Sequence, residues 1–131
     1  MASFNPETDI PAEYWSFVEK SRDETSTRAY LSSCSKEELV RLFRHGVEAR
    51  AELAYVLVEE GRVPDASEDT LDDLSEGIIS QGRRAYLDCY YGRRALPPRQ
   101  DWEDMRALIH ILVEAHRQRF EGENIFDSIE D

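Results

Sequence analysis

Basic residues are scarce in this sequence. Of its 131 residues, 16 are lysine or arginine while 28 are aspartate or glutamate, which gives a formal net charge of −12 at pH 7. A protein with this net charge repels phosphate groups, so the composition argues against general affinity for nucleic acid or for anionic membranes. We expect no direct nucleic-acid binding, and a protein partner with a basic surface is the partner that the charge favours.

Long apolar runs and a targeting pattern are missing as well. No uninterrupted apolar stretch approaches the roughly 20 residues that a membrane span needs. The N-terminal sequence MASFNPETDIPAEYW lacks a basic segment followed by an apolar one, which is the pattern of a secretory signal. We therefore expect a cytoplasmic protein that does not associate with membranes.

The usual signatures of catalysis are also lacking. The sequence has no GxSxG motif, no cysteine-centred catalytic signature and no glycine loop of the kind that cradles phosphate. Its two cysteines, Cys34 and Cys89, have no CxxC spacing and are expected to be reduced, partly buried thiols. No catalytic residue is predicted, and among 28 acids a pair acting as general acid and base cannot be singled out.

Histidine is too sparse to predict a metal site. His110 and Glu114 are four residues apart and could place two ligands on one helix face. No HExxH motif or dense cluster of histidine and cysteine supplies the third and fourth ligands that zinc requires. We expect surface or capping histidines, with His110 near a buried stripe, and neither a metal nor another cofactor.

What the sequence does contain is helical periodicity. Ser35 and Glu38 have the S-x-x-E spacing of a capping box, which predicts a long helix beginning there. Gly61 supplies a stop in the left-handed conformation. Apolar residues recur between these signals at steps of three and four: Leu39, Leu42, Phe43, Val47, Ala51, Ala54 and Leu57 or Val58.

Three further helices are expected, at residues 11–22, 67–91 and 102–120. In the second of these, Gly77 and Gly82 each cost about 1 kcal/mol relative to alanine, so either another helix packs closely there or the segment bends. Residues 23–34 are expected to be a loop with a short helical turn. The apolar stripe of the last helix is expected to comprise Met105, Leu108, Ile109, Leu112, Val113 and Phe120.

The predicted fold class is all-α. We expect a single-domain bundle of four main helices plus short helical turns over residues 1–121. Residues 122–131 contain four acids and no base, and they are predicted to form an acidic, partly ordered C-terminal tail.

Several segments resemble a family of bacterial helical proteins. They are LAYVLVEEG at 53–61, SED at 67–69 and IISQGRRAY at 78–86, together with the pair Tyr14 and Trp15 near the N-terminus. Over roughly residues 14–98 the chain resembles the family catalogued as domain of unknown function 4240. The resemblance implies an all-α fold and a bacterial cytosolic origin, and it brings no activity with it. Small acidic bacterial proteins of this kind are sometimes toxin-neutralising immunity proteins or accessory regulators.

Six acids without an intervening base lie between residues 65 and 76. One interpretation is that they complement the positive end of a helix and are otherwise solvated. The other is a docking face for a basic partner, because the four-residue step aligns them in two rows. The predicted docking face comprises Glu68, Asp69, Asp72, Asp73 and Glu76.

Arginine and tyrosine alternate in the segment that follows. Such a mixture can hold an anion or a nucleic-acid strand by charge-assisted hydrogen bonds and stacking. Cations near a helix C-terminus are also expected from the helix dipole alone, so a structural interpretation stays open. The possible anion or ligand patch comprises Arg83, Arg84, Tyr86, Tyr90, Arg93 and Arg94.

The leading functional hypothesis is a non-enzymatic module that binds a protein through the acidic docking face, with an immunity-type inhibitor as one form of it. A small hydrolase or ligand-sensing domain with a pocket near the arginine and tyrosine cluster is the first alternative. A nucleic-acid mimic, with acids spaced like phosphates, is the second.

Overall fold

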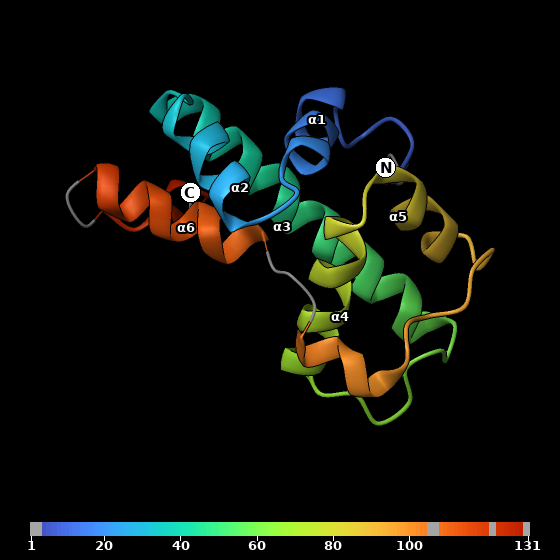
Figure 1. Cartoon of the computed structure of the whole chain (residues 1–131). Coiled ribbons are helices and arrows are strands. Elements are labelled where there is room, and N and C mark those ends of the chain that lie inside the picture. The colour runs from blue at the N-terminus through green and yellow to red at the C-terminus, as the bar shows by residue number, and fades with distance from the viewer. Residues whose placement is uncertain (1–3, 105–107, 121–122, 130–131) are drawn as a thin grey trace.

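A computed structural model describes residues 4–104, 108–120 and 123–129, and its regular secondary structure is helical throughout (Figure 1). This confirms the all-α fold class. These ranges contain six α-helices: α1 (Ala12–Lys20), α2 (Glu24–Ser32), α3 (Lys36–Glu59), α4 (Glu68–Ser80), α5 (Arg83–Tyr90) and α6 (Leu108–Arg119). Two short 3-10 helices, Arg99–Asp104 and Ile125–Ile129, precede and follow α6.

The long helix α3 is the centre of the molecule. It contacts α1, α4, α5 and α6, and α2 packs on α6 (Figure 1). The helix begins as its sequence predicts, because the Ser35 hydroxyl accepts from the Glu38 N–H at 3.1 Å and the Glu38 carboxylate accepts from the Ser35 N–H at 2.8 Å. It ends before Gly61, whose φ of 66° gives the left-handed stop.

The predicted count of four main helices is not confirmed, since the described residues form six. The expected helix at 67–91 divides into α4 and α5 at Gly82, whose φ of 111° no helical residue adopts. Residues 23–34, expected to be mostly loop, contain α2. That helix begins with a capping box in which the Asp23 carboxylate accepts from the Ser26 N–H at 2.7 Å. A serine at the position where glutamate or glutamine is usual had concealed this signal.

The expected last helix at 102–120 also differs from prediction. Its first residues belong to the 3-10 helix, in which Trp102 is buried and donates its indole N–H to the Pro97 carbonyl at 2.8 Å. Leu108, Ile109 and Leu112 form the buried stripe of α6, whereas Val113 and Phe120 are only partly buried. Met105 lies outside the described residues.

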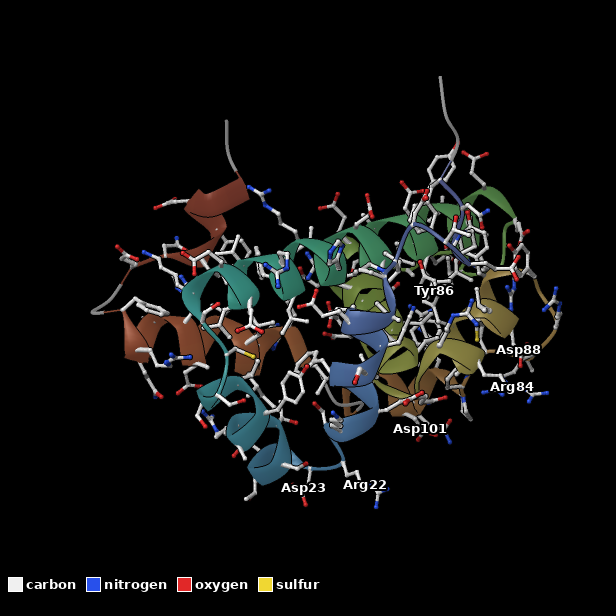
Figure 2. All side chains as sticks on the ribbon, turned by 90° about the horizontal axis from the view of Figure 1, so that it is seen from above. Arg22, Asp23, Arg84, Tyr86, Asp88 and Asp101 are labelled. Atoms are coloured by element: carbon white, nitrogen blue, oxygen red, sulfur yellow. The ribbon has the colours of Figure 1, made fainter. Side chains whose placement is uncertain are left out.

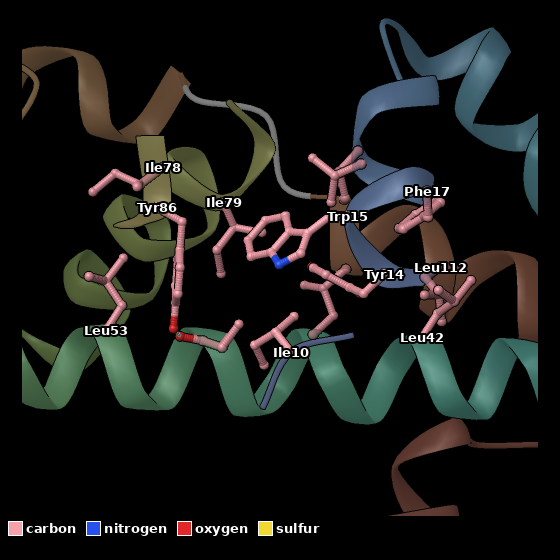
Figure 3. Close-up of a cluster of buried hydrophobic side chains, with 14 of the residues drawn as sticks. Ile10, Tyr14, Trp15, Phe17, Leu42, Leu53, Ile78, Ile79, Tyr86 and Leu112 are labelled. Atoms are coloured by element: carbon pink, nitrogen blue, oxygen red, sulfur yellow. Dashed lines mark hydrogen bonds between the residues drawn. The ribbon is translucent and has the colours of Figure 1, made fainter. Parts of the chain in front are cut away.

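The core lies between α3 and the helices around it (Figure 3). Four apolar side chains of α1 are buried in it: Tyr14, Trp15, Phe17 and Val18. The Trp15 ring packs against Tyr86 with 5.4 Å between ring centroids, which joins α1 to α5. Two aromatic residues far apart in sequence therefore close the core over one face of α3.

The boundary expected between domain and tail, at residues 121 and 122, lies outside the described residues. Beyond it, Ile125 is 1% exposed, and the Phe126 ring meets Phe43 of α3 edge-on at 5.0 Å. The described part of the tail therefore packs on α3 and α6. None of the helices in the described ranges combines the length and apolar character that crossing a membrane requires.

Candidate functional site

The acidic docking face expected from the sequence lies at the start of α4. The Ser67 hydroxyl caps this helix by accepting from the Thr70 N–H at 3.2 Å, so the first acids follow directly on the helix N-terminus. Glu68 and Asp69 are exposed, and Asp72 and Asp73 are partly buried one turn later. Four of the five predicted acids therefore retain contact with solvent at one end of α4.

The fifth acid, Glu76, is not on this surface. Its side chain is 5% exposed, and its carboxylate lies 3.5 Å from the Arg50 guanidinium of α3. The four-residue row that begins at Glu68 thus runs from the surface into the protein. Asp72, in the middle of the row, lies 3.7 Å from the same guanidinium and is about half exposed. Arg50 therefore connects the surface acid to the buried one.

The environment of Glu76 changes its acidity. Burial raises the pKa of this carboxyl to about 7, although the Arg50 guanidinium and a hydrogen bond from the Ile109 backbone N–H both favour the ionised form. The nearby Asp72 carboxylate raises the pKa further. Glu76 is consequently a structural acid that joins α4 to α3 and to the start of α6, and it is not accessible to a partner in this conformation.

A groove with an apolar floor borders the surface acids. It lies between α3 and α4, has a volume of about 450 Å³, and contains two carboxylates and no base among its lining residues. Large apolar side chains are exposed in it, since Tyr55 is 62% and Val58 is 53% exposed. The residues that line the groove, named here the α3–α4 groove, are Ala51, Ala54, Tyr55, Val58, Glu68, Leu71 and Asp72.

Sequence reasoning missed the floor of this groove. The apolar stripe of α3 left open whether Leu57 or Val58 faces the core, and the structure buries Leu57 completely while exposing Val58. Ala51 was assigned to the same stripe but is exposed. A signal was present, because Tyr55 and Val58 form a second apolar row three residues apart, displaced from the buried row.

The arginine and tyrosine residues of the predicted ligand patch do not converge on one site. Tyr86 is fully buried, and its hydroxyl donates to the Ala49 carbonyl of α3 at 2.9 Å. Figure 2 shows Tyr86 directed toward the inside of the molecule, while Arg84 lies at the outer side of α5. Tyr90 is partly buried and packs against Tyr86 with 6.1 Å between ring centroids. These tyrosines belong largely to the core.

The arginines of the patch occupy both ends of α5. Arg83 and Arg84 are in its first turn, so the interpretation that they complement a helix C-terminus is wrong for these two. Arg93 and Arg94 lie beyond the C-cap residue Tyr91, outside the last turn of α5, which contains no basic residue. Arg93 stacks on the exposed Tyr91 ring at 4.8 Å, and Arg94 lies 3.3 Å from the Asp88 carboxylate.

One cavity includes a member of this patch. It has a volume of about 460 Å³ and lies between the N-terminal segment, α1 and the start of α5. Arg83 lines it and donates to the Glu7 carbonyl at 3.1 Å, but the carboxylate residues Glu7 and Glu19 line it too. An anion entering this cavity would face two acids beside one arginine, which disfavours anion binding there.

The histidines do not assemble a metal site. His110, expected near the buried stripe, is exposed, whereas His116 is buried. Neither ring nitrogen of His116 makes a hydrogen bond of ordinary geometry in the described part of the chain, although a backbone group of Glu123 lies near enough to favour its protonated form. Burial nevertheless lowers the pKa of His116. Among residues 4–104, 108–120 and 123–129, no three potential ligands are placed to hold a metal ion.

Comparison with protein-family models, with curated proteins and with solved structures finds no match for this chain. The resemblance to the family of domain of unknown function 4240 therefore stays a prediction, and no residue role is taken from a relative. The surface formed by the start of α4 and the α3–α4 groove is the candidate functional site on its own geometry.

Proposed function

We propose that this chain is a non-enzymatic protein-binding module that engages a basic surface of its partner through the start of α4. One observation carries the proposal. Two carboxylates, Glu68 and Asp72, border a groove in which Tyr55 and Val58 are exposed. Acids that merely complement a helix dipole need no apolar neighbours, whereas a protein interface combines an apolar centre with a charged rim.

Charge supports the same proposal. The net charge of −12 attracts basic partners over a distance, and the acids beside the groove concentrate negative charge at one part of the surface. Blocking a basic cleft of another protein, as an immunity-type inhibitor does, is one form of this function, and an accessory regulator is another. A bacterial origin and a cytoplasmic location remain predictions from the sequence.

The alternative of a small hydrolase or ligand sensor has weaker support. Of the six residues assigned to its pocket, only Arg83 lines the neighbouring cavity, and two acids share that cavity with it. The nucleic-acid mimic requires acids spread across several elements like phosphates along a strand. The rows of α4 supply four surface acids on a single helix, which favours a compact protein interface.

The experiment compares affinity capture by the wild-type chain with capture by two variants of equal charge change. The test variant carries Glu68→Gln, Asp69→Asn and Asp73→Asn. It spares Asp72, because that carboxylate also pairs with Arg50. The control variant carries Glu19→Gln, Glu37→Gln and Glu48→Gln, which are exposed acids on α1, on the first turn of α3 and near the middle of α3.

The tagged proteins are incubated with nuclease-treated lysate of the source cell at low salt, and bound proteins are identified by mass spectrometry. We expect a stoichiometric basic partner that is retained by the wild type and the control variant and lost by the test variant. Equal retention by the two variants, or no stoichiometric partner at all, would contradict the proposed function.

A further inference from the structure

We infer that the occupant of the α3–α4 groove is an amphipathic basic helix of the partner, with apolar side chains seated on the groove floor and lysine or arginine facing α4. This inference rests on the proposed function and specifies the form that the partner takes there. Helix-in-groove recognition uses apolar anchors at steps of three and four residues on one face of the bound helix. The groove has an apolar floor for such anchors and carboxylates for basic residues beside them.

The dimensions of the groove fit two turns of a helix. Its α3 wall runs from Ala51 to Val58, a length of about 10 Å at the rise of an α-helix. The small side chains Ala51 and Ala54 leave room for a ridge of the incoming helix, while Tyr55 and Val58 stand beside that space. Leu71 of α4 supplies the opposite apolar contact. Two anchors one turn apart would cover this floor.

The charge of the groove is one-sided, which sets the orientation of the occupant. Both carboxylates of the lining, Glu68 and Asp72, come from α4, and the α3 residues of the lining are uncharged. Arg50 of α3, outside the lining, pairs with Asp72 and leaves Glu68 without a cation in the lining. An occupant therefore places its basic residues along the edge facing α4 and its apolar residues over α3. The exposed Glu59 and Glu60 at the end of α3 extend the negative potential beyond Val58.

Other occupants fit this surface less well. An extended segment is usually held by hydrogen bonds to a free strand edge, and the described ranges contain no strand. A second copy of the chain brings its own net charge of −12, so the two copies repel each other at this acidic groove. A basic helix satisfies the apolar floor and the carboxylates together.

The test uses three designed peptides of about 18 residues with alanine-rich backbones, a length at which helix formation is appreciable. The first carries leucine at a four-residue step flanked by lysine and arginine. The second has the same composition, with the order scrambled so that no apolar face forms. The third replaces the basic residues of the first by glutamate. Binding to the full chain is measured by fluorescence anisotropy and mapped by amide chemical shifts.

Variants of the chain test the contribution of the apolar floor to binding separately from that of the acids. Tyr55→Gln with Val58→Gln removes the apolar floor without adding charge. Tyr91→Gln serves as its control, because Tyr91 is 40% exposed, directly follows α5 and does not line the groove. We expect the first peptide to bind at the residues lining the groove. We expect its affinity to fall about tenfold or more with the floor variant and with the scrambled order, and to stay unchanged with Tyr91→Gln.

Three results would overturn the inference. If both basic peptides bind equally, recognition does not require an apolar helix face, and the proposed function stands without this inference. If the first peptide does not bind, or binds elsewhere, the groove is not its site. If the wild type forms a dimer that the floor variant abolishes, the occupant is a second copy. Undiminished binding of the first peptide to the Glu68, Asp69 and Asp73 variant would instead contradict the proposed function.

Discussion

The Glu76 carboxylate lies 3.5 Å from the Arg50 guanidinium, and the two side chains are only 5% and 22% exposed. The backbone N–H of Ile109 donates to the same carboxylate. Burial raises the pKa of the Tyr14 hydroxyl of α1, and the charge of Glu76 raises it further. An acid assigned by sequence to an outer surface thus joins α4 to α3 and α6, and its charge reaches α1.

This burial predicts a pH-dependent stability. The pKa of Glu76 is raised from its ordinary 4.5 to about 7 in the folded chain. The unfolded chain therefore loses this proton first as pH rises, so the contribution of Glu76 to the free energy of unfolding is greatest below about pH 4.5 and declines up to about pH 7. The expected loss is roughly 3 kcal/mol.

Glu76→Gln should remove this decline. Urea denaturation of wild type and variant at several values between about pH 5 and pH 8 measures the difference in unfolding free energy. Taking that difference cancels the effects of the other titrating acids. We expect the variant to gain stability relative to wild type as pH rises. A difference that is constant over this range would show that Glu76 titrates normally.

Replacing Arg50 should cost an amount of stability that depends on pH, whereas the cost of a simple packing defect should not. Arg50→Met leaves the Glu76 carboxylate without its cation, which costs roughly 3 kcal/mol when that carboxylate is ionised near pH 8 and less when it is protonated near pH 5. Arg41→Met is the matched control, because Arg41 pairs with Glu13 at 3.0 Å on the exposed surface, where ion pairs are screened by solvent, so this variant should lose much less stability. Equal losses for the two variants would contradict the account.

Tyr86→Phe tests whether this tyrosine is part of the core or of a ligand site. Its hydroxyl donates to the Ala49 carbonyl at 2.9 Å in the buried contact between α5 and α3. We expect a loss of about 1 kcal/mol in the free energy of unfolding, measured by denaturation. Capture of the protein partner should be unchanged. A loss of capture with unchanged stability would show that Tyr86 belongs to the binding surface.

The α3 capping box predicts a local effect that leaves the candidate site alone. Ser35→Ala removes the acceptor for the Glu38 N–H and should cost about 1 kcal/mol of stability. Amide hydrogen exchange should quicken chiefly in the first turn of α3, more than two turns away from Ala51. Uniform protection across α3 would show that other contacts fix this helix end.

These features differ in how far sequence alone predicts them. The start of α3 at Ser35 and its end before Gly61 depend on local chemistry, and both were predicted. The break at Gly82 was only one of two options, because a glycine within an apolar pattern is compatible with close packing or with a bend. Its φ of 111° depends on how α5 turns back onto α3, which is tertiary information.

The sequence predicted some residues of the candidate site and not others. The four surface acids follow from a run of charge near a helix start. The burial of Glu76 does not, because Arg50 lies 26 residues away in sequence and only the packing of α3 on α4 brings the two together. The exposure of Val58 likewise depends on the rotation of α3, since Leu57 one position earlier fits the core equally well.

The most direct test of the proposed binding surface is the affinity of the captured partner for the wild-type chain, measured over a series of salt concentrations and repeated with the two charge variants. We expect Glu68→Gln, Asp69→Asn and Asp73→Asn together to weaken binding about tenfold or more at low salt and to flatten its salt dependence, while the Glu19, Glu37 and Glu48 variant stays close to wild type. Equal affinity and equal salt dependence for the two variants would contradict a binding surface at the start of α4.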